Sequence, residues 1–255
     1  MMFLERLIQT GMQDNPYWYS LDYNWFAKND LWLPNCTCFS CGRSSEAAGR
    51  NVKLQIPRGN AQTWYDASNW IGSRTPKVGA IAVWGGGKYG HVGVVERINS
   101  DGSVLISQSN YTRASKEAMI ANYFVIGTYK PEVGKVTKHI GWTFLGYLIN
   151  PYIDDKRVSR NPNRRQVEIH EERVRARKSP NGEIYKGLFI PMGTYNILDQ
   201  DGDWVKVDDA VWFSLGSWSK VYEPDNELYR ELQDLIAKRD ELNRQIEELK
   251  KKLEA

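Results

Sequence analysis

The stretch Leu33-Pro34-Asn35-Cys36-Thr37-Cys38-Phe39-Ser40-Cys41-Gly42-Arg43 holds every cysteine of this 255-residue chain. Pro34 and Asn35 are typical of a turn followed by a helix N-cap, so a helix is predicted to begin at Cys36 and to end near Gly49. A thiol in the first turn of a helix lies at the positive end of the helix dipole, which favours the thiolate. The stretch therefore indicates either a nucleophilic cysteine or, from its Cys-x-Cys-x-x-Cys spacing, a metal site.

Helix geometry argues against the metal site. On an α-helix Cys38 points well away from Cys36, and Cys41 lies roughly 140° around the axis from Cys36. Thiols on different faces of one helix are poor joint ligands for a metal ion. We therefore predict no metal and no cofactor, and we expect Cys38 and Cys41 to be small buried residues.

The composition is that of an ordinary folded protein, with 41% hydrophobic and 25% charged residues. The net charge of +3 is too small to indicate a nucleic-acid-binding protein, and the basic excess between Lys156 and Lys178 could favour an acidic surface such as a cell wall. No run reaches the roughly 18 apolar residues of a membrane span, and the first ten residues lack a signal-peptide pattern. We expect a protein that does not insert into membranes and that acts outside the cytoplasm only after release.

The first half of the chain predicts helices followed by strands, which is the order of an α+β fold. Residues 3–12 place apolar side chains on one helical face, and residues 36–49 and 61–70 predict two further helices. After Pro76 the pattern predicts strands of one antiparallel sheet at residues 78–84, 91–98, 103–107, 123–129 and 142–149.

The second half predicts three further parts. Residues 153–166 are charged and lack apolar periodicity, so they are predicted to form a basic linker. The short strands and turns over residues 167–223 are typical of a small β-barrel. Residues 225–255 repeat leucine or isoleucine in alternating steps of four and three, interrupted only at Arg239. This pattern predicts a coiled-coil helix that forms a homo-oligomer, with dimer, trimer and tetramer open and packing on its own domain as the alternative.

A cysteine nucleophile requires a base, and His91 is the strongest candidate among the three histidines. His91 begins an apolar strand directly after a glycine-rich loop, where a side chain can reach a cleft. The sequence therefore predicts that Cys36 and His91 act as a pair.

Several ordered segments agree with one known family. They are Asn35-Cys36-Thr37-x-Phe39-x-x-Gly42-Arg43, Gly59-Asn60-Ala61-x-x-Trp64, Pro76-x-Val78-Gly79-Ala80-Ile81-Ala82-Val83-Trp84, Tyr89-Gly90-His91-Val92-Gly93-Val94-Val95-Glu96 and Ser107-Gln108-Ser109-Asn110-Tyr111. Together they resemble the CHAP domain, the cysteine, histidine-dependent amidohydrolase/peptidase of the papain-like NlpC/P60 group. The resemblance covers residues 1–152 and implies N-terminal helices packed on an antiparallel sheet.

The resemblance implies that Cys36 is the nucleophile and that His91 is first base and then acid in the cleavage of an amide. Many relatives carry a glutamate where this chain has Gln108. We therefore expect Asn110 to orient the imidazole, with Gln108 assisting. Glu96 lies five residues after His91, on the opposite face of the strand, and is a weaker candidate.

Aromatic side chains are candidate ligand contacts in both halves, with core packing as the alternative for each of them. In the first half the candidate substrate contacts are Trp32, Trp64, Trp84 and Tyr111. The segment Asp201-Gly202-Asp203-Trp204-Val205-Lys206-Val207 resembles the bacterial SH3-like domains of cell-wall enzymes, over residues 167–223. That resemblance implies wall contacts by Tyr185, Tyr195, Trp204 and Trp212.

Taken together, these features predict a bacteriophage endolysin or a related autolysin whose substrate is Gram-positive peptidoglycan. The muramoyl–alanine amide and a cross-bridge peptide bond both stay open as the bond that is cut. Two alternatives are a non-catalytic wall-binding protein and a metal-binding protein built on Cys36, Cys38 and Cys41. An oligomer formed through residues 225–255 would add avidity for the wall.

Overall fold

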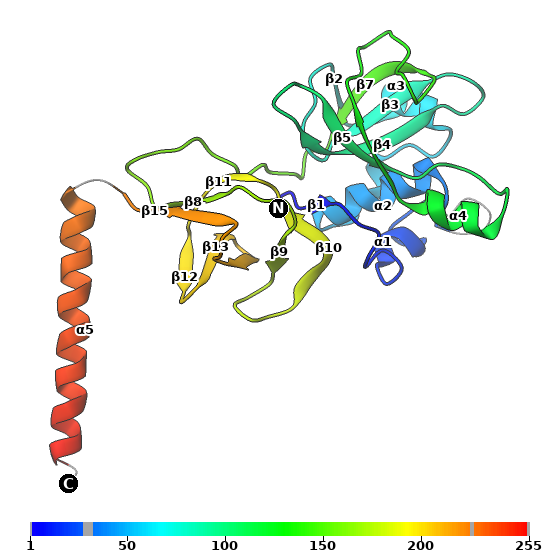
Figure 1. Cartoon of the computed structure of the whole chain (residues 1–255). Coiled ribbons are helices and arrows are strands. Elements are labelled where there is room, and N and C mark those ends of the chain that lie inside the picture. The colour runs from blue at the N-terminus through cyan, green and yellow to red at the C-terminus, as the bar shows by residue number, and fades with distance from the viewer. Residues whose placement is uncertain (1, 28–32, 225–226, 254–255) are drawn as a thin grey trace.

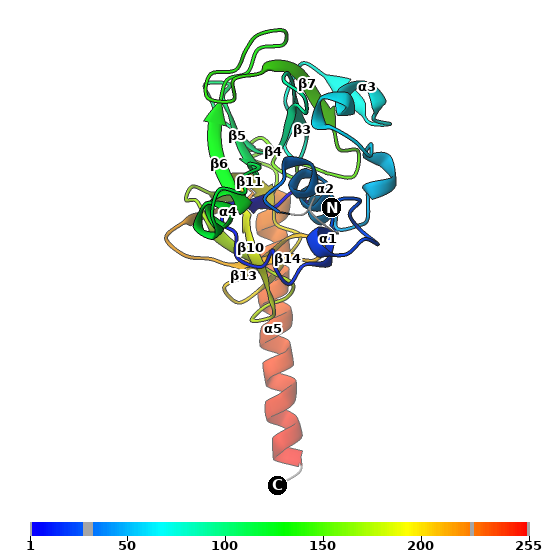
Figure 2. The same cartoon turned by 90° about the vertical axis from the view of Figure 1, so that its right-hand side faces the viewer.

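The computed structural model describes residues 2–27, 33–224 and 227–253. An N-terminal domain built around a six-stranded sheet is followed by a second domain of shorter strands (Figure 1). A long C-terminal helix then projects away from both domains, as Figure 2 shows from the side. In the part of the chain that is described, no helix is long and apolar enough to span a bilayer.

Helix α2 (Cys36–Ala48) is the centre of the N-terminal domain, and it confirms the helix predicted from Cys36. Asn35 caps its first turn, and Gly49 ends it in a left-handed conformation with φ of 61°. Every residue of α2 after Cys36 is buried. The helix is therefore packed on all sides, and only its first residue reaches the surface.

The sheet beside α2 is antiparallel throughout, as expected, with the order β2-β7-β3-β4-β5-β6. Both faces are apolar: Val83 and Val92 share a cluster with the α2 side chains, while Ala82 and Trp84 belong to a second cluster. Burial on both faces explains why these strands read as unbroken apolar runs. The strands are β2 (Ile71–Ser73), β3 (Ile81–Gly85), β4 (His91–Ile98), β5 (Val104–Gln108), β6 (Val125–Tyr129) and β7 (Thr143–Ile149).

Short helices complete this domain. The helix predicted over residues 61–70 is shorter than expected, because the chain turns after Ala67 and then enters β2. Helix α4 (Lys116–Tyr123) was not predicted, although Ser115 caps it by accepting from the Ala118 amide. The remaining short helices are α1 (Pro16–Tyr19), η2 (Lys53–Gln55), η3 (Ala61–Thr63) and α3 (Trp64–Ala67).

The helix predicted over residues 3–12 is wrong. Strand β1 (Glu5–Arg6) pairs with β10 (Ile184–Ile190) of the second domain, and residues 8–12 form bends and turns. Met2 and Leu4 lie in the core of the second domain, whereas Phe3 packs against the N-terminal domain. The apolar residues thus alternate between two cores with the period of a strand, which a helical reading of the same residues misses.

The second domain contains two antiparallel sheets, β1-β10-β9-β14-β13-β12 and β11-β8-β15. Residues 155–165, in the predicted linker, form neither helix nor strand and run along this domain, where the Val158 amide donates to the Thr194 carbonyl. The short strands that the sequence predicts are present and enclose a core that includes Val167 and Phe213. The strands not yet given are β8 (Gln166–Ile169), β9 (Val174–Arg177), β11 (Gly193–Asn196), β12 (Asp199–Asp201), β13 (Trp204–Asp208), β14 (Val211–Ser214) and β15 (Ser219–Tyr222).

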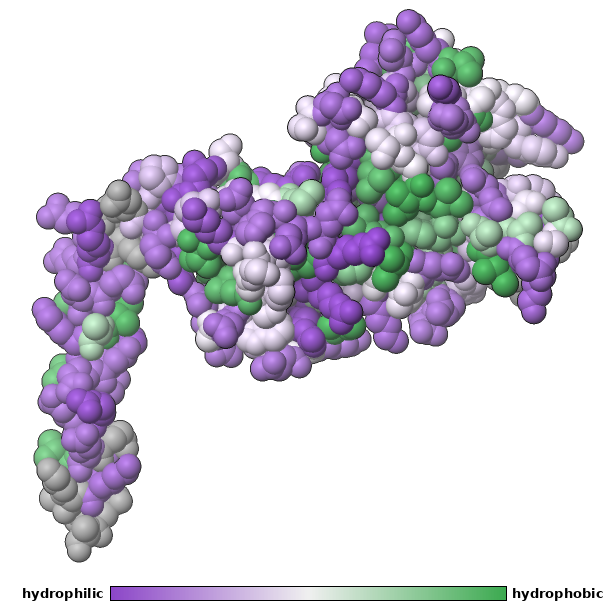
Figure 3. Space-filling view, viewed as in Figure 1, coloured by the Kyte–Doolittle hydropathy of each residue, from purple (hydrophilic) through white to green (hydrophobic). Residues whose placement is uncertain are grey.

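Helix α5 (Glu227–Leu253) matches the helix predicted for the C-terminal segment. It projects away from both domains (Figure 1), and its apolar seam is exposed at Leu232, Leu235, Leu242, Ile246 and Leu249. In Figure 3 this helix is a largely hydrophilic rod with separate green patches along it. Self-association through this seam stays a prediction.

Candidate active site

The first turn of α2 is fixed to the end of strand β5. The Asn35 side-chain oxygen accepts from the amides of Thr37 at 2.9 Å and Cys38 at 3.1 Å, as an N-cap does. The Asn35 backbone N–H donates to Ser109 Oγ at 3.0 Å, and that hydroxyl donates to the Asn122 carbonyl at 2.9 Å. Cys36 is therefore placed where β5 ends.

The Cys36 thiol lies beside the start of strand β4. The backbone N–H of Val92, which directly follows His91, lies near the Cys36 sulfur and lowers the pKa of the thiol. Cys36 is partly exposed, whereas Cys38 and Cys41 are fully buried. Of the three cysteines, Cys36 alone combines access to solvent with a position next to the strand that begins with His91.

Burial sets the protonation of both residues. It raises the pKa of the Cys36 thiol to about 11, although N–H groups of Val92, Thr37 and Cys36 itself oppose the rise. Burial also lowers the pKa of His91, against the effect of its hydrogen bond to Gln108. Both groups are consequently neutral at neutral pH. Desolvation outweighs the helix dipole, so the thiolate expected from the sequence is not the resting form.

The hydrogen bonds of Gln108 fix the tautomer of His91. His91 Nε2 is bonded to the Gln108 side-chain oxygen, and the Gln108 amide nitrogen donates to Tyr129 Oη at 2.6 Å. Because a carbonyl oxygen only accepts, Nε2 must carry the proton. Nδ1 is then the basic nitrogen, which can accept a proton from a neighbouring thiol.

The orienting contact differs from the one predicted, since Gln108 and not Asn110 holds the imidazole. The backbone N–H of Asn110 instead donates to the Asn122 carbonyl at 3.0 Å, beyond the end of β5. Gly93 lies opposite Gln108, where an added Cβ would be only 3.3 Å from the Gln108 Cβ and closer still to Ile106. A glycine at that position therefore allows Gln108 to lie close to β4.

Glu96 does not serve His91. It points to the other face of β4, as the sequence predicts, and forms a buried ion pair with Arg43 at 2.8 Å. The His91 ring packs instead against Trp84 and Trp142, with ring centroids 5.8 and 5.9 Å away. Trp142 and Tyr129 were not among the predicted site residues. The sequence places Trp142 at the start of the strand predicted over residues 142–149 and otherwise gives no sign that it meets His91.

The predicted substrate contacts separate into core and surface residues. Trp64 and Trp84 are fully buried, and Trp84 donates through Nε1 to Thr137 Oγ1 at 2.8 Å, so packing is their role. Tyr111 is 65% exposed just beyond β5 and is open to a ligand. Trp32 lies outside the described residues.

The predicted wall contacts separate in the same way. Tyr195 is a core residue whose hydroxyl donates to the Pro191 carbonyl at 2.6 Å. Tyr185, Trp204 and Trp212 are half-buried and present part of their rings at the surface. Cations lie over the two tryptophan rings, namely Arg177 over Trp204 and Lys206 over Trp212.

Among the described residues, no group of three or more His, Cys, Asp or Glu side chains is placed to share a metal ion. The Cys38 sulfur instead lies 3.7 Å from the Asn24 amide nitrogen and 3.9 Å from the Trp18 carbonyl oxygen. A cavity of about 460 Å³ lies at the junction of the two domains. Another, of about 440 Å³, lies beside residues 149–155. Cys36 lines neither of them.

Comparison with known families matches residues 22–110 to the CHAP domain. The chain contains a CHAP domain. The matched stretch includes Cys36, His91, Gln108 and Asn110, which are the residues that the structure gathers around the ends of α2, β4 and β5.

Relatives of the CHAP domain include N-acetylmuramoyl-L-alanine amidase sle1 of Staphylococcus epidermidis and of Staphylococcus aureus. Each is 40% identical over 73 residues, which is 25% of this chain and 22% of the relative. A crystal structure of N-acetylmuramoyl-L-alanine amidase from Staphylococcus aureus is 29% identical, covers 37% of this chain and 26% of that chain, and has a TM-score of 0.31. The chain thus spans about a quarter of the length of these relatives.

The protonation of Cys36 gives the first testable prediction. Because burial favours the uncharged thiol, the thiolate of Cys36 should form only as the pH approaches about 11. The ultraviolet absorbance of thiolate, measured in the wild type minus Cys36→Ala, should therefore be absent at neutral pH and rise in strong alkali. A rise in this absorbance difference below neutral pH would instead show a thiolate–imidazolium pair.

Proposed function

We propose that this protein is a peptidoglycan hydrolase that cleaves an amide bond with Cys36 as its nucleophile. The observation that carries the proposal is the position of Cys36, at the start of α2 and beside the first residues of the strand that begins with His91. That pair lies inside the stretch that matches the CHAP domain. The name of the staphylococcal relatives favours the N-acetylmuramoyl-L-alanine bond over a cross-bridge peptide bond.

The reaction starts from a neutral pair. As the Cys36 sulfur bonds to the substrate carbonyl carbon, His91 Nδ1 accepts the thiol proton. The resulting imidazolium then donates this proton to the leaving amine, and the C–N bond breaks to give an acyl-enzyme. His91 next accepts a proton from water as the water oxygen attacks the thioester. The carboxylic acid leaves, and the sulfur regains its proton.

The negative charge that develops on the carbonyl oxygen needs a hydrogen-bond donor. Asn35 caps the amides of Thr37 and Cys38, but the Cys36 amide is oriented toward its own sulfur. This amide is therefore at the reacting centre and is the candidate oxyanion donor. Gln108 holds the ring in place, yet its neutral amide stabilises the imidazolium less than a carboxylate would.

The second domain and α5 complete the proposal. We assign the second domain as an SH3-like wall-binding module, on the support of the half-buried rings of Tyr185, Trp204 and Trp212. We assign α5 to a homo-oligomer, because its exposed leucines follow a heptad pattern. A catalytic domain followed by a wall-binding module is the arrangement of a bacteriophage endolysin, which would reach Gram-positive peptidoglycan after release from the host cytoplasm.

Loss of the nucleophile is the central prediction. Cys36→Ala should reduce the clearing of purified Gram-positive walls by at least about 10³-fold, because the covalent step is lost. The buried-thiol control Cys41→Ala should keep its activity. Mass spectrometry of the wild-type digest should show free stem peptides with new N-terminal alanine.

Other results would change the assignment. New glycine or D-residue termini would identify an endopeptidase. Equal clearing by wild type and Cys36→Ala would refute the thiol mechanism, and a wild type that binds walls without clearing them would indicate a non-catalytic binder. A stoichiometric metal content in the purified protein would favour the metal-binding alternative.

The orienting residue gives a separate prediction. Gln108→Ala should lower kcat by about 10²-fold through misplacement of the imidazole, and Asn110→Ala should have a smaller effect. Gln108→Glu should raise the pKa of His91, because a carboxylate stabilises the imidazolium. Since the base must be unprotonated, the acid limb of the pH–rate profile should then move to higher pH. A larger loss in Asn110→Ala than in Gln108→Ala would overturn this assignment.

The oligomer is tested by mass. The chain has a mass of 29.4 kDa, and light scattering of the full chain should give a multiple of this value. Truncation after Pro224 should give a monomer. Leu242→Lys should weaken the assembly by placing a charge in the apolar seam, whereas Arg244→Lys, away from the seam, should not. If the full chain and the truncated chain contain the same number of subunits per particle, association through α5 is refuted.

A further inference from the structure

The N-terminal segment belongs to both domains at once. Its strand β1 pairs Glu5 with Phe189 and Arg6 with Leu188 at the edge of the second-domain sheet. Its Glu5 side chain bonds Arg97 of β4 with an Nε–Oε1 distance of 2.8 Å. The segment therefore connects the second domain to the strand that carries His91.

Arg6 makes the most extensive of these contacts. Its side chain is fully buried, and Nε donates to Glu46 of α2 at 2.8 Å. A second nitrogen of the guanidinium also bonds Glu46, and the same side chain donates to the carbonyls of Thr10 and Lys186. The Arg6 backbone N–H donates to Glu96 of β4 at 2.8 Å. One residue of the N-terminal strand thus contacts both α2 and β4.

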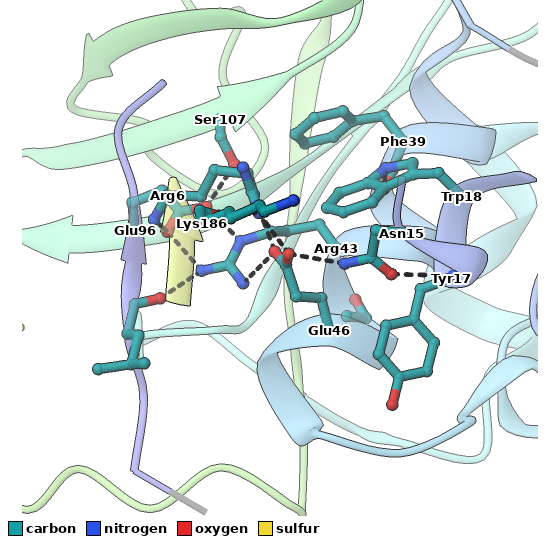
Figure 4. Close-up of polar contacts among 12 residues, drawn as sticks. Arg6, Asn15, Tyr17, Trp18, Phe39, Arg43, Glu46, Glu96, Ser107 and Lys186 are labelled. Atoms are coloured by element: carbon teal, nitrogen blue, oxygen red, sulfur yellow. Dashed lines mark hydrogen bonds and ion pairs between the residues drawn. The ribbon is translucent and has the colours of Figure 1, made fainter. Parts of the chain in front are cut away.

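Arg43 closes the network, as Figure 4 shows. It donates to both carboxylate oxygens of Glu96 at 2.8 Å and to Glu46 at 3.0 Å. Ser107 of β5 adds a further bond to Glu96 at 2.6 Å. Two cations and two anions therefore balance in a buried site, where removal of one charge leaves its partners uncompensated.

The network lies on the same helix and the same strand as Cys36 and His91. Cys36 is the first residue of α2 and His91 is the first residue of β4. Glu46 and Glu96 lie farther along the same helix and the same strand. A clamp at Glu46 and Glu96 therefore limits how α2 can slide or rotate on β4, and such movement would separate the thiol from the imidazole.

We propose that Arg6 is a positioning residue, which locks α2 to β4 from the second-domain side and so keeps Cys36 aligned with His91. The inference rests on the proposed thiol chemistry. In this arrangement the second domain is a structural part of the catalytic unit as well as a wall-binding module. Arg6 acts through the ion network and does not touch the reacting atoms.

The test is the pH dependence of Cys36 alkylation by iodoacetamide, mapped by mass spectrometry in the absence of peptidoglycan. In the wild type, the rate of Cys36 alkylation plotted against pH should show an inflection at the pKa of His91, because the neutral imidazole accepts the thiol proton. His91→Ala supplies the reference profile without this inflection. Arg6→Met should lose most of the inflection and should lower kcat on walls by about 10-fold with little change in KM. Arg6→Lys keeps the charge and should recover part of the inflection and part of kcat.

The matched control is Glu172→Gln. Glu172 pairs with Arg97 between the two domains and makes no bond to α2, so its loss should leave the alkylation profile unchanged. A folded Arg6→Met with the wild-type profile and kcat would overturn the proposal and leave the network a purely structural role. Where circular dichroism shows that Arg6→Met does not fold, Arg6→Lys decides: a reduced inflection supports the proposal, and a wild-type profile overturns it. If the wild type does not cut walls, the proposed function is refuted. The alkylation profiles of wild type and Arg6→Met can still be compared in that case.

Discussion

The geometry of the site depends on one residue, Asn35, which joins the start of α2 to the end of β5. Its side chain caps the helix, and its backbone N–H is held by Ser109 on the strand side. An N-cap alone fixes where a helix begins, but a second bond also fixes where that beginning lies relative to the sheet. Cys36 follows directly, so these bonds fix its position beside the end of β5.

Tight burial around that junction explains the chemistry of the resting site. The N–H groups that point at the sulfur would stabilise a thiolate, but the loss of water around the thiol outweighs them. The neighbouring imidazole is neutral for the same reason. Both groups of the resting site are therefore uncharged, and the neutral Gln108 adds no charge beside the imidazole.

Local signals allowed much of this fold to be predicted from the sequence. Asn35 as a cap and Gly49 as a stop determine α2, and two-sided burial makes strands such as β4 recognisable. The choice between Gln108 and Asn110 was not predictable, because it depends on how closely β5 lies beside Gly93 of β4. The extended conformation of Met2 to Arg6 was not predictable either, since its partner strand lies far along the chain.

The separation of β1 and β10 along the sequence affects how the protein folds during synthesis. Glu5 pairs with Phe189, so the two partners are 189 − 5 = 184 residues apart in sequence. A ribosome must synthesise most of the chain before the first strand can find its place, and contacts between distant residues form slowly. Until then Met2 and Leu4 are without the core that buries them in the native state. The N-terminal domain of the nascent chain therefore stays without the pairing of β1 and β10 until β10 has been synthesised.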